Sequence, residues 1–292
     1  MSTSAASNAI VRTHAHDPRT TRSKGHIFAV GGAEEKFGDE EVLCAFVVLA
    51  GGTNARIVLI PSASSDPDDA IATYREAFGR IGIGSFQVIQ GTSADEMDTD
   101  EHIDILSQAT GVFMSGGDQS TLAERLCGTR VAACLMERNA EGVVVGGTSA
   151  GAAILASHMV EGGEGGATPR RSMATVGEGL GLLQNVIVDT HFGARGRTGR
   201  LMAMHAAYPD VIAIGLDEDT AAVIDGDMIM QVVGSGAVTI VDGTSIRSDL
   251  DNCDEDEPLM ISGVELHTVT RDYQFDIRGR RFVPALRQTY TQ

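Results

Sequence analysis

The chain has few basic residues, few cysteines and no long apolar run, and each shortage argues against a class of function. Lys and Arg together number 22 against 40 Asp and Glu in 292 residues, so the net charge is −18. Nucleic acids and anionic membrane surfaces both require a basic footprint, so we expect neither as a partner. No stretch approaches the run of about 18 apolar residues that a membrane-spanning helix needs.

The cysteines follow no spacing typical of a metal or redox site. Three of them lie in apolar helical patterns, which is typical of buried free thiols in a reducing compartment; the four are Cys44, Cys127, Cys134 and Cys253. Residues 1–24 are polar and lack the apolar centre of a secretion signal. We therefore expect a cytoplasmic protein with a disordered arm over residues 1–24 and a single domain over residues 25–292.

Short apolar runs alternate with helical patterns over most of the chain. The expected strands lie at 26–30, 55–61, 86–89, 111–114, 142–145, 182–188 and 211–216. The expected helices lie at about 39–49, 66–81, 100–108, 118–127, 131–141, 150–157 and 197–206. This alternation predicts an α/β fold with a doubly wound, mostly parallel sheet whose functional sites lie at the carboxyl ends of its strands.

The last third of the chain has a different pattern. From residue 220 onward only strands are expected, at 220–224, 228–233, 237–241, 265–269 and 273–282. The glycine-rich segment 161–179 indicates an exposed loop. The acidic run 248–258 indicates a solvated loop as well. We find no internal repeat and no linker that would divide the chain into two domains.

One turn has the pattern of a nucleophile elbow. Gly147-Thr148-Ser149-Ala150-Gly151 follows the apolar run 142–145 and precedes a small, helix-permissive segment. In this strand–turn–helix context Gly-x-Ser-x-Gly is typical of serine hydrolases, because small neighbours permit the strained turn that exposes the serine. The first N–H groups of the helix would then face an anion formed beside Ser149. The alternative is a glycine-rich turn whose serine only caps the helix.

A serine nucleophile needs a base, and His191 is the best placed of the eight histidines. It follows the expected strand 182–188, whereas the others lie in or beside the arm, in helices or in a late strand: His14, His16, His26, His102, His158 (at the end of the helix after Ser149), His205 and His267. Arg195, Arg197 and Arg200 come soon after it. Because guanidinium groups bind carboxylates through paired hydrogen bonds, we expect a substrate that carries carboxylates.

The acid and the oxyanion donors are less sharply defined by the sequence. Spacing does not choose the partner of His191 among four acids that lie near strand ends, which are Asp189, Asp217, Glu218 and Asp219. An oxyanion hole requires backbone N–H groups. Ala150 would offer one, and the Gly116-Gly117 turn would offer another if its strand neighbours that of Ser149.

Four motifs, taken together, resemble the cyanophycinase family, which are serine exopeptidases of the peptidase E type. They are 113–119 (FMSGGDQ), 146–151 (GGTSAG), 189–192 (DTHF) with the arginines after it, and 215–221 (GLDEDTA). The resemblance runs in order from residue 25 to the C-terminus. It implies a fold similar to the class I glutamine amidotransferases, which is flavodoxin-like, with extra C-terminal β strands.

The resemblance also implies a role for each matching residue. Ser149 would be the nucleophile, His191 the base and Glu218 the acid that orients it, with the N–H groups of Gly117 and Ala150 as the oxyanion hole. The implied substrate pocket contains Gln119, Asp189, Thr190, Arg195, Arg197 and Arg200. The arginines would hold carboxylates, and Asp189 would hold a guanidinium. Thr190 stands where the family usually has Gln, so one substrate contact has a shorter reach.

The family degrades cyanophycin, a polyaspartate whose side-chain carboxylates each carry an arginine, and releases β-aspartyl-arginine dipeptides. The resemblance therefore implies acyl-enzyme chemistry on cyanophycin or β-aspartyl peptides, without a metal or organic cofactor, in a homodimer. Other functions stay open. A related aspartyl dipeptidase should lack the arginine cluster, and a non-catalytic binding protein would retain only the pocket. An α/β-hydrolase esterase orders its residues Ser, acid, His, so it would use His267 with Asp217 or Asp219.

Overall fold

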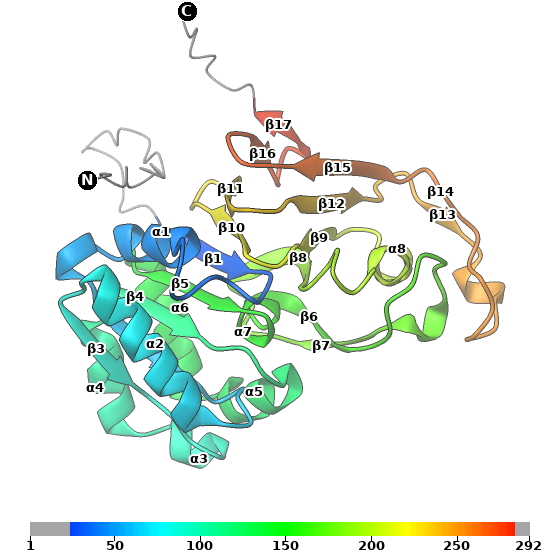
Figure 1. Ribbon diagram of the computed structural model, residues 1–292. Coiled ribbons are helices and arrows are strands. Elements are labelled where there is room, and N and C mark those ends of the chain that lie inside the picture. The colour runs from blue at the N-terminus through cyan, green and yellow to red at the C-terminus, as the bar shows by residue number, and fades with distance from the viewer. Residues whose placement is uncertain (1–23, 284–292) are drawn as a thin grey trace, which may run out of the picture.

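The computed structural model describes residues 24–283. Within them, the first of two large sheets contains β1 (Ile27–Val30), β2 (Arg56–Ile60), β3 (Ser85–Val88), β4 (Gly111–Met114), β5 (Val144–Thr148), β10 (Thr220–Ile224), β11 (Ile229–Gly234), β16 (Gln274–Asp276) and β17 (Arg281–Val283). Its order is β17-β16-β11-β10-β1-β5-β4-β2-β3 (Figure 1). β1, β5, β4, β2 and β3 are parallel, and the four later strands extend the sheet antiparallel.

The second large sheet is built from the later part of the chain. It contains β6 (Ala156–Gly162), β7 (Thr175–Glu178), β8 (Leu183–Asp189), β9 (Ile212–Leu216), β12 (Val238–Asp242) and β15 (Glu265–Val269), in the order β15-β12-β9-β8-β6-β7. Its central strands β6, β8 and β9 are parallel. A short ribbon pairs β13 (Arg247–Ser248) with β14 (Ile261–Ser262). The predicted fold class, including the extra C-terminal strands, is confirmed.

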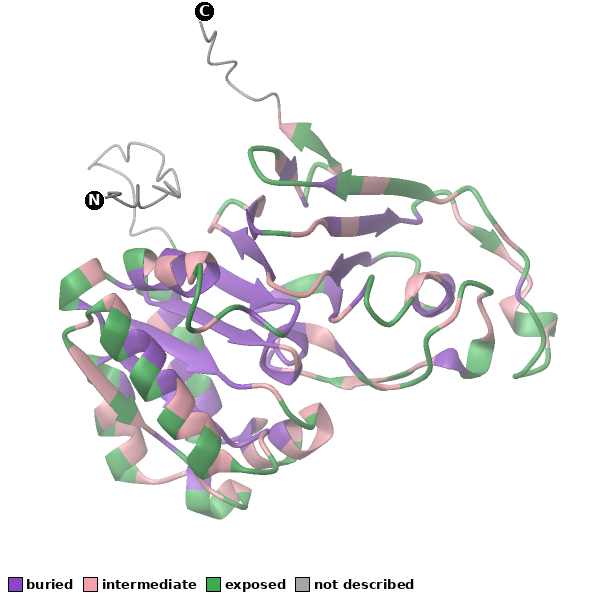
Figure 2. Ribbon diagram, in the orientation of Figure 1, coloured by how far each residue is buried: buried purple, intermediate pink, exposed green. Residues whose placement is uncertain are grey.

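Helices cover both faces of the first sheet. They are α1 (Glu41–Leu49), α2 (Pro67–Ile81), α3 (Ala94–Met97), α4 (Asp100–Gln108), α5 (Gln119–Leu126), α6 (Arg130–Ala140), the one-turn α7 (Ala150–Ala153) and, on the second sheet, α8 (Thr198–Ala207). Alternate residues of β1 enter different cores: Phe28 joins the core under α1 and α2, and Ala29 the one under α4 to α6. Figure 2 shows the strands buried between these layers. No helix within residues 24–283 could cross a bilayer.

Side-chain caps explain why several helices begin where the sequence predicts. Asp66, Ser93, Thr99, Asp118 and Thr129 each accept the backbone N–H three residues further on. A cap satisfies an N–H group that the first turn of a helix leaves without a partner. The short helix α3 has such a cap but too little apolar pattern to be predicted.

Three sequence predictions about secondary structure were wrong. The helix expected over 150–157 ends at Ala153, and the chain continues as β6, because pairing with β7 and β8 outweighs helix propensity. His158 therefore lies in a strand. The loop expected over 161–179 contains β7, and the strand expected over 273–282 is broken into β16 and β17 by a turn.

Two further predictions concern buried thiols and the arm. Cys44, Cys127 and Cys134 are free but only half-buried. Their burial still raises the pKa of each thiol. The predicted N-terminal arm lies, apart from Lys24, outside the described residues.

Candidate active site

Ser149 lies in a strained turn between β5 and α7. Its backbone has φ 52° and ψ −111°, a conformation that costs about 1–3 kcal/mol and persists only where the surroundings enforce it. Its N–H donates to the carbonyl of Val30 at 3.0 Å. A Cβ at Gly147 would lie 2.6 Å from the Gly151 carbonyl oxygen, and one at Gly151 would lie 2.3 Å from the Met114 oxygen, so only glycine fits at both positions. The elbow predicted from the sequence thus has the close approach that its glycines allow.

A continuous hydrogen-bonded chain joins Ser149, His191 and Glu218. Ser149 Oγ lies 2.9 Å from His191 Nε2, and His191 Nδ1 lies 2.6 Å from Glu218 Oε1. The serine follows β5 of the first sheet, whereas His191 follows β8 and Glu218 follows β9 of the second. The three side chains therefore meet where the two sheets join.

The glycine turn after β1, Gly31-Gly32, contacts both the backbone and the ring of His191. The N–H of His191 donates to the Gly31 carbonyl at 2.7 Å. Gly32 has φ 101°, and a Cβ there would lie 2.3 Å from the His191 ring. Because any larger residue would displace the imidazole, the space beside the ring requires glycine.

Two backbone N–H groups lie at the turns beside the serine. Gly116 packs against Ser149, since a Cβ at Gly116 would lie 3.4 Å from the Cβ of Ser149. Gly117 has φ 143° and approaches the Ala63 carbonyl so closely that a Cβ would lie 1.9 Å from it. No group in residues 24–283 accepts a hydrogen bond from the N–H of Gly117 or of Ala150.

The acids that flank Glu218 hold the loops around it. Asp217 accepts the N–H of Gly193 at 2.9 Å, on the loop just after His191. Asp219 accepts the N–H of Glu35 at 3.0 Å, on the loop after β1. Spacing alone left these acids as rivals for the histidine, and the structure gives each a different partner.

Asp189 has a different partner from the one expected. It is 1% exposed, and its carboxylate binds Arg200, with Nε 2.9 Å from Oδ2, and Arg197, with Nη1 3.2 Å from Oδ1. A carboxylate that is buried and paired with two arginines has no free face for a substrate guanidinium. The resemblance implied such a contact, and the burial of Asp189 accounts for the difference.

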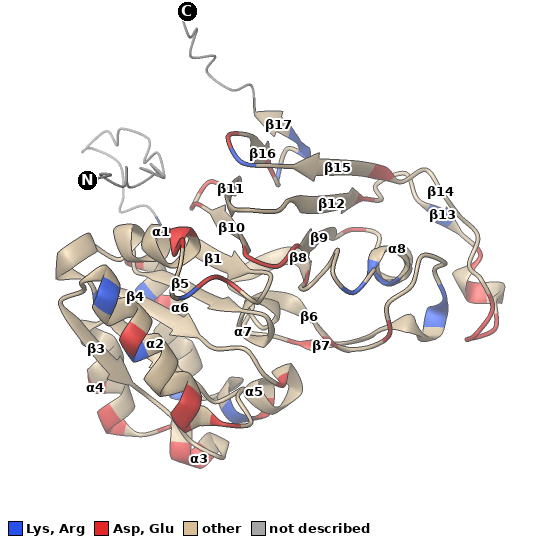
Figure 3. Cartoon of the chain, in the orientation of Figure 1, with Lys and Arg blue, Asp and Glu red and all other residues tan. Residues whose placement is uncertain are grey.

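The three arginines differ in how much of each guanidinium is free. Arg200 is 2% exposed and also donates to the Gly163 carbonyl, so it is part of the scaffold. Arg197 donates to the Thr190 carbonyl, and burial lowers its pKa from the usual value. Its Nε has no partner among the described residues. Arg195 is exposed, and no ion pair to it exists within residues 24–283. Figure 3 shows basic positions on α8 and on the loop that leads into it.

Two further residues belong to the predicted pocket, Gln119 and Thr190. Gln119, at the start of α5, donates through Nε2 to the carbonyl of Glu161 in β6. Thr190, which precedes His191, is 6% exposed. Its carbonyl, rather than its hydroxyl, makes the contact with Arg197.

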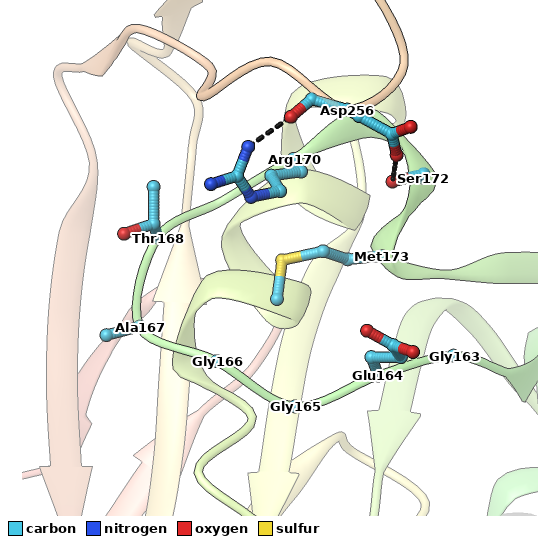
Figure 4. A pocket seen from close by; sticks show the side chains of 10 residues that line it. All are labelled: Gly163, Glu164, Gly165, Gly166, Ala167, Thr168, Arg170, Ser172, Met173 and Asp256. Atoms are coloured by element: carbon cyan, nitrogen blue, oxygen red, sulfur yellow. Dashed lines mark hydrogen bonds between the residues drawn. The ribbon is translucent and has the colours of Figure 1, made fainter.

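A pocket of about 500 Å³ lies between the glycine-rich segment after β6 and the acidic loop (Figure 4). Arg170 donates to the carbonyl of Asp256, and the Ser172 hydroxyl donates to the Asp256 carboxylate at 2.9 Å. The N–H of Gly166 donates at 2.8 Å to the carbonyl of Gly196, which lies between Arg195 and Arg197. Asp256 thus holds the acidic loop 248–258 against the glycine-rich segment, and that segment in turn contacts the loop that carries these arginines.

Comparison with known proteins assigns the chain to a family. The family model of peptidase family S51 matches residues 27–232. The chain belongs to peptidase family S51. It is therefore a hydrolase, a serine peptidase.

The similar sequences cover almost the whole S51 peptidase. Cyanophycinases from Trichormus variabilis and Synechococcus elongatus are each 37% identical to it, over 92% and 91% of this chain and 90% and 82% of their own. A cyanophycinase from Geminocystis herdmanii is 36% identical over 84% of this chain and 90% of its own. The crystal structure of a peptidase from an acI-B1 Actinobacterium has the same fold, with a TM-score of 0.64 at 22% identity, and the match covers 87% of this chain and 98% of that one.

Sequence reasoning missed one buried acid of the S51 peptidase. Glu34 is 3% exposed, and its Oε2 accepts the Thr148 hydroxyl at 2.5 Å. Glu34, Glu35 and Lys36 together have the composition of a solvated surface, which concealed it. The available signal was position, since Glu34 follows a glycine turn at the carboxyl end of β1.

Proposed function

We propose that this S51 peptidase hydrolyses cyanophycin and releases β-aspartyl-arginine dipeptides through an acyl-enzyme on Ser149. The observation that carries the proposal is the hydrogen-bonded chain from Ser149 through His191 to Glu218. This arrangement is what activation of a serine requires. The relatives named cyanophycinase, at 37% identity over most of the chain, support the choice of substrate.

The geometry supports a role for each of these groups. Glu218 accepts from Nδ1 of His191, so Nε2 is free to take the proton of Ser149 Oγ as the oxygen attacks the scissile carbonyl. The N–H groups of Gly117 and Ala150 stabilise the oxyanion. His191 then gives the proton to the leaving amine, and the ester formed with Ser149 is hydrolysed by water, for which His191 again acts as base.

Substrate carboxylates would bind to the exposed Arg195 and to the part of Arg197 that is accessible, since its side chain is 11% exposed and guanidinium forks match carboxylates. Asp189 and Arg200 contribute indirectly, because their buried ion pair fixes the start of α8 and with it Arg197. Gln119 and Thr190 complete the proposed pocket. The shorter side chain of Thr190 leaves more room beside His191 than a glutamine would.

The test is to incubate cyanophycin granules with the wild type and with Ser149→Ala, and to identify the soluble products by mass. The proposal requires β-aspartyl-arginine from the wild type alone. Intact polymer in a preparation whose Ser149 reacts with a fluorophosphonate would retain the hydrolase and reject the substrate. A preparation that neither cleaves nor labels would favour a binding protein.

The esterase alternative predicts a different base. His267 lies in β15, with its ring 5.1 Å from that of Phe275 and 5.6 Å from that of Phe282, among aromatic side chains rather than beside Ser149. Comparing His191→Ala with His267→Ala on an ester substrate separates the two, since our proposal requires only the first to be inactive. The homodimer and the cytoplasmic location remain predictions; light scattering on the purified protein tests the first.

A further inference from the structure

Glu34 is a buried carboxylate that the proposed mechanism does not use. Its side chain is 0% exposed although it is polar. Oε2 accepts the Thr148 hydroxyl at 2.5 Å, while Oε1 accepts the Tyr74 hydroxyl and lies 3.1 Å from Lys36 Nζ. A buried polar group is tolerated where hydrogen-bond partners reach it, and here three donors converge on one carboxyl group.

The three donors come from separate parts of the fold. Thr148 ends β5, Tyr74 lies in the middle of α2, and Lys36 belongs to the loop after β1. Burial and the Glu34 carboxylate raise the pKa of Tyr74 well above its usual value, so the phenol remains a donor. Glu34 therefore ties the end of the nucleophile strand to the helix layer that covers it.

The hydrogen bond from Thr148 to Glu34 is made one residue before Ser149. That serine is held away from the ordinary backbone regions, and its N–H already bonds to Val30 of the neighbouring strand. The Thr148 hydroxyl gives the turn a second anchor on the other side of the same peptide. A change in the Thr148 backbone would move Ser149 Oγ relative to His191 Nε2.

The loop that carries Glu34 also holds the other two members of the hydrogen-bonded chain. Gly31 accepts the N–H of His191 at 2.7 Å, and Gly32 accepts that of Asp219, next to Glu218, at 2.8 Å. The loop thus contacts the neighbourhood of the base and of the acid through its backbone. On the nucleophile side, the contact is made by the side chain of Glu34.

We propose that Glu34 is a positioning residue: through the Thr148 hydroxyl its carboxylate fixes Ser149 Oγ against His191 Nε2. The inference rests on the proposed function, because it requires Ser149 to be the nucleophile. Among the described residues, Glu34 makes no hydrogen bond or ion pair to Ser149, His191, Glu218 or a proposed pocket residue; its partners are Lys36, Tyr74 and Thr148. Its loss should therefore lower kcat and the reactivity of Ser149 without changing KM.

The experiment uses three substitutions in the full-length protein. Thr148→Val removes the hydroxyl at nearly constant volume, Glu34→Met removes both acceptors, and Glu34→Gln keeps one acceptor for Thr148. We expect the first two to lower kcat on cyanophycin and the rate of fluorophosphonate labelling by roughly 10- to 100-fold, the scale of a small misplacement of reacting groups. Glu34→Gln should retain most of the rate. The double variant Glu34→Met/Thr148→Val should be no slower than the slower single variant, since both break one link.

Tyr74→Phe is the matched control. It removes a hydroxyl from the same carboxylate and leaves the Thr148 contact, so it should lower the melting temperature while labelling stays fast. Labelling of folded Thr148→Val at the wild-type rate would overturn the inference and leave Glu34 a purely structural acid. If Glu34→Met does not fold, Thr148→Val decides alone. A wild type that does not label would instead reject the proposed function.

Discussion

The two sheets contribute to the site in different ways. The first sheet provides the Ser149 hydroxyl on a strained turn and the backbone N–H groups of Gly117 and Ala150, at turns where glycines allow close backbone contacts. The second provides side chains, namely His191, Glu218 and the arginines around α8. The difference teaches that the proposed nucleophile depends on close backbone packing, whereas the proposed base, acid and pocket depend on hydrogen bonds that can be removed one at a time.

The largest expected effect on kcat comes from removing the Ser149 hydroxyl, which the first sheet provides. Ser149→Ala should lower kcat by about 10⁶-fold, as loss of the nucleophile does in serine proteases. The alanine removes only Oγ, so the melting temperature should stay close to that of the wild type. The measurement is dipeptide release from cyanophycin, with calorimetry as the control. Substantial turnover by the variant would refute the assignment of the nucleophile.

Loss of Glu218, which the second sheet provides, should lower kcat less than loss of Ser149 does. Glu218→Gln should lower kcat by about 10⁴-fold, because the amide can favour the wrong imidazole tautomer while the serine and the oxyanion donors remain. Steady-state kinetics on cyanophycin measures the loss. Asp217→Asn is the matched comparison, since it changes a neighbouring acid whose carboxylate accepts the N–H groups of Gly193 and Ala237 rather than contacting His191. An equal or larger loss in Asp217→Asn would contradict the assignment of Glu218.

The arginines should affect binding more than chemistry. Arg195→Ala removes an exposed guanidinium, and we expect KM to rise by about tenfold, the loss of one charge-assisted hydrogen bond, with kcat little changed. Arg200→Ala should instead destabilise the fold, because it leaves Asp189 buried without its main partner. Kinetics and thermal unfolding of both variants separate the roles. If KM rose only in Arg200→Ala, the binding role would belong to Arg200 and not to Arg195.

The smallest expected effect on activity comes from His205, whose influence is on stability at acid pH. Burial lowers the pKa of His205 from 6.5 to about 4, with Asp242 opposing the shift and Arg280 adding to it. Because the folded pKa lies below the unfolded one, the unfolded chain takes up the proton first as the pH falls. His205 therefore costs no stability above pH 6.5 and about 1.4 kcal/mol per pH unit between pH 6.5 and 4. Urea unfolding at several pH values should show that the free energy of unfolding falls less steeply with falling pH in His205→Leu than in the wild type. If the two proteins lost stability equally, His205 would not be the cause of the pH dependence.

The sequence predicted the regions that have strong periodicity. The parallel strands, the capped helices and the late β segment came from alternation and capping, and Ser149 and His191 came from position at strand ends. The choice of Glu218 needed the resemblance, since spacing treated Asp217, Glu218 and Asp219 alike. The structure separates them because adjacent residues in one turn point at different loops.

The features that were missed depend on tertiary contacts. Helix α7 ends after one turn because β6 finds partners in β7 and β8, which lie later in the chain. Asp189 belongs to a buried ion pair with Arg200, although the sequence shows only an acid beside a histidine. Glu34 resembles a surface acid until Thr148, which lies 114 positions away, is placed against it.

The division of the site between two sheets also bears on how the protein is synthesised. Ser149 leaves the ribosome before His191, and Glu218 follows later still. A nascent chain that has formed β5 and the elbow therefore carries a serine with no base to activate it. Since β8 pairs with β6 and β9 pairs with β8, we expect hydrolysis to begin only after the chain has been made beyond Glu218 and these three strands have assembled.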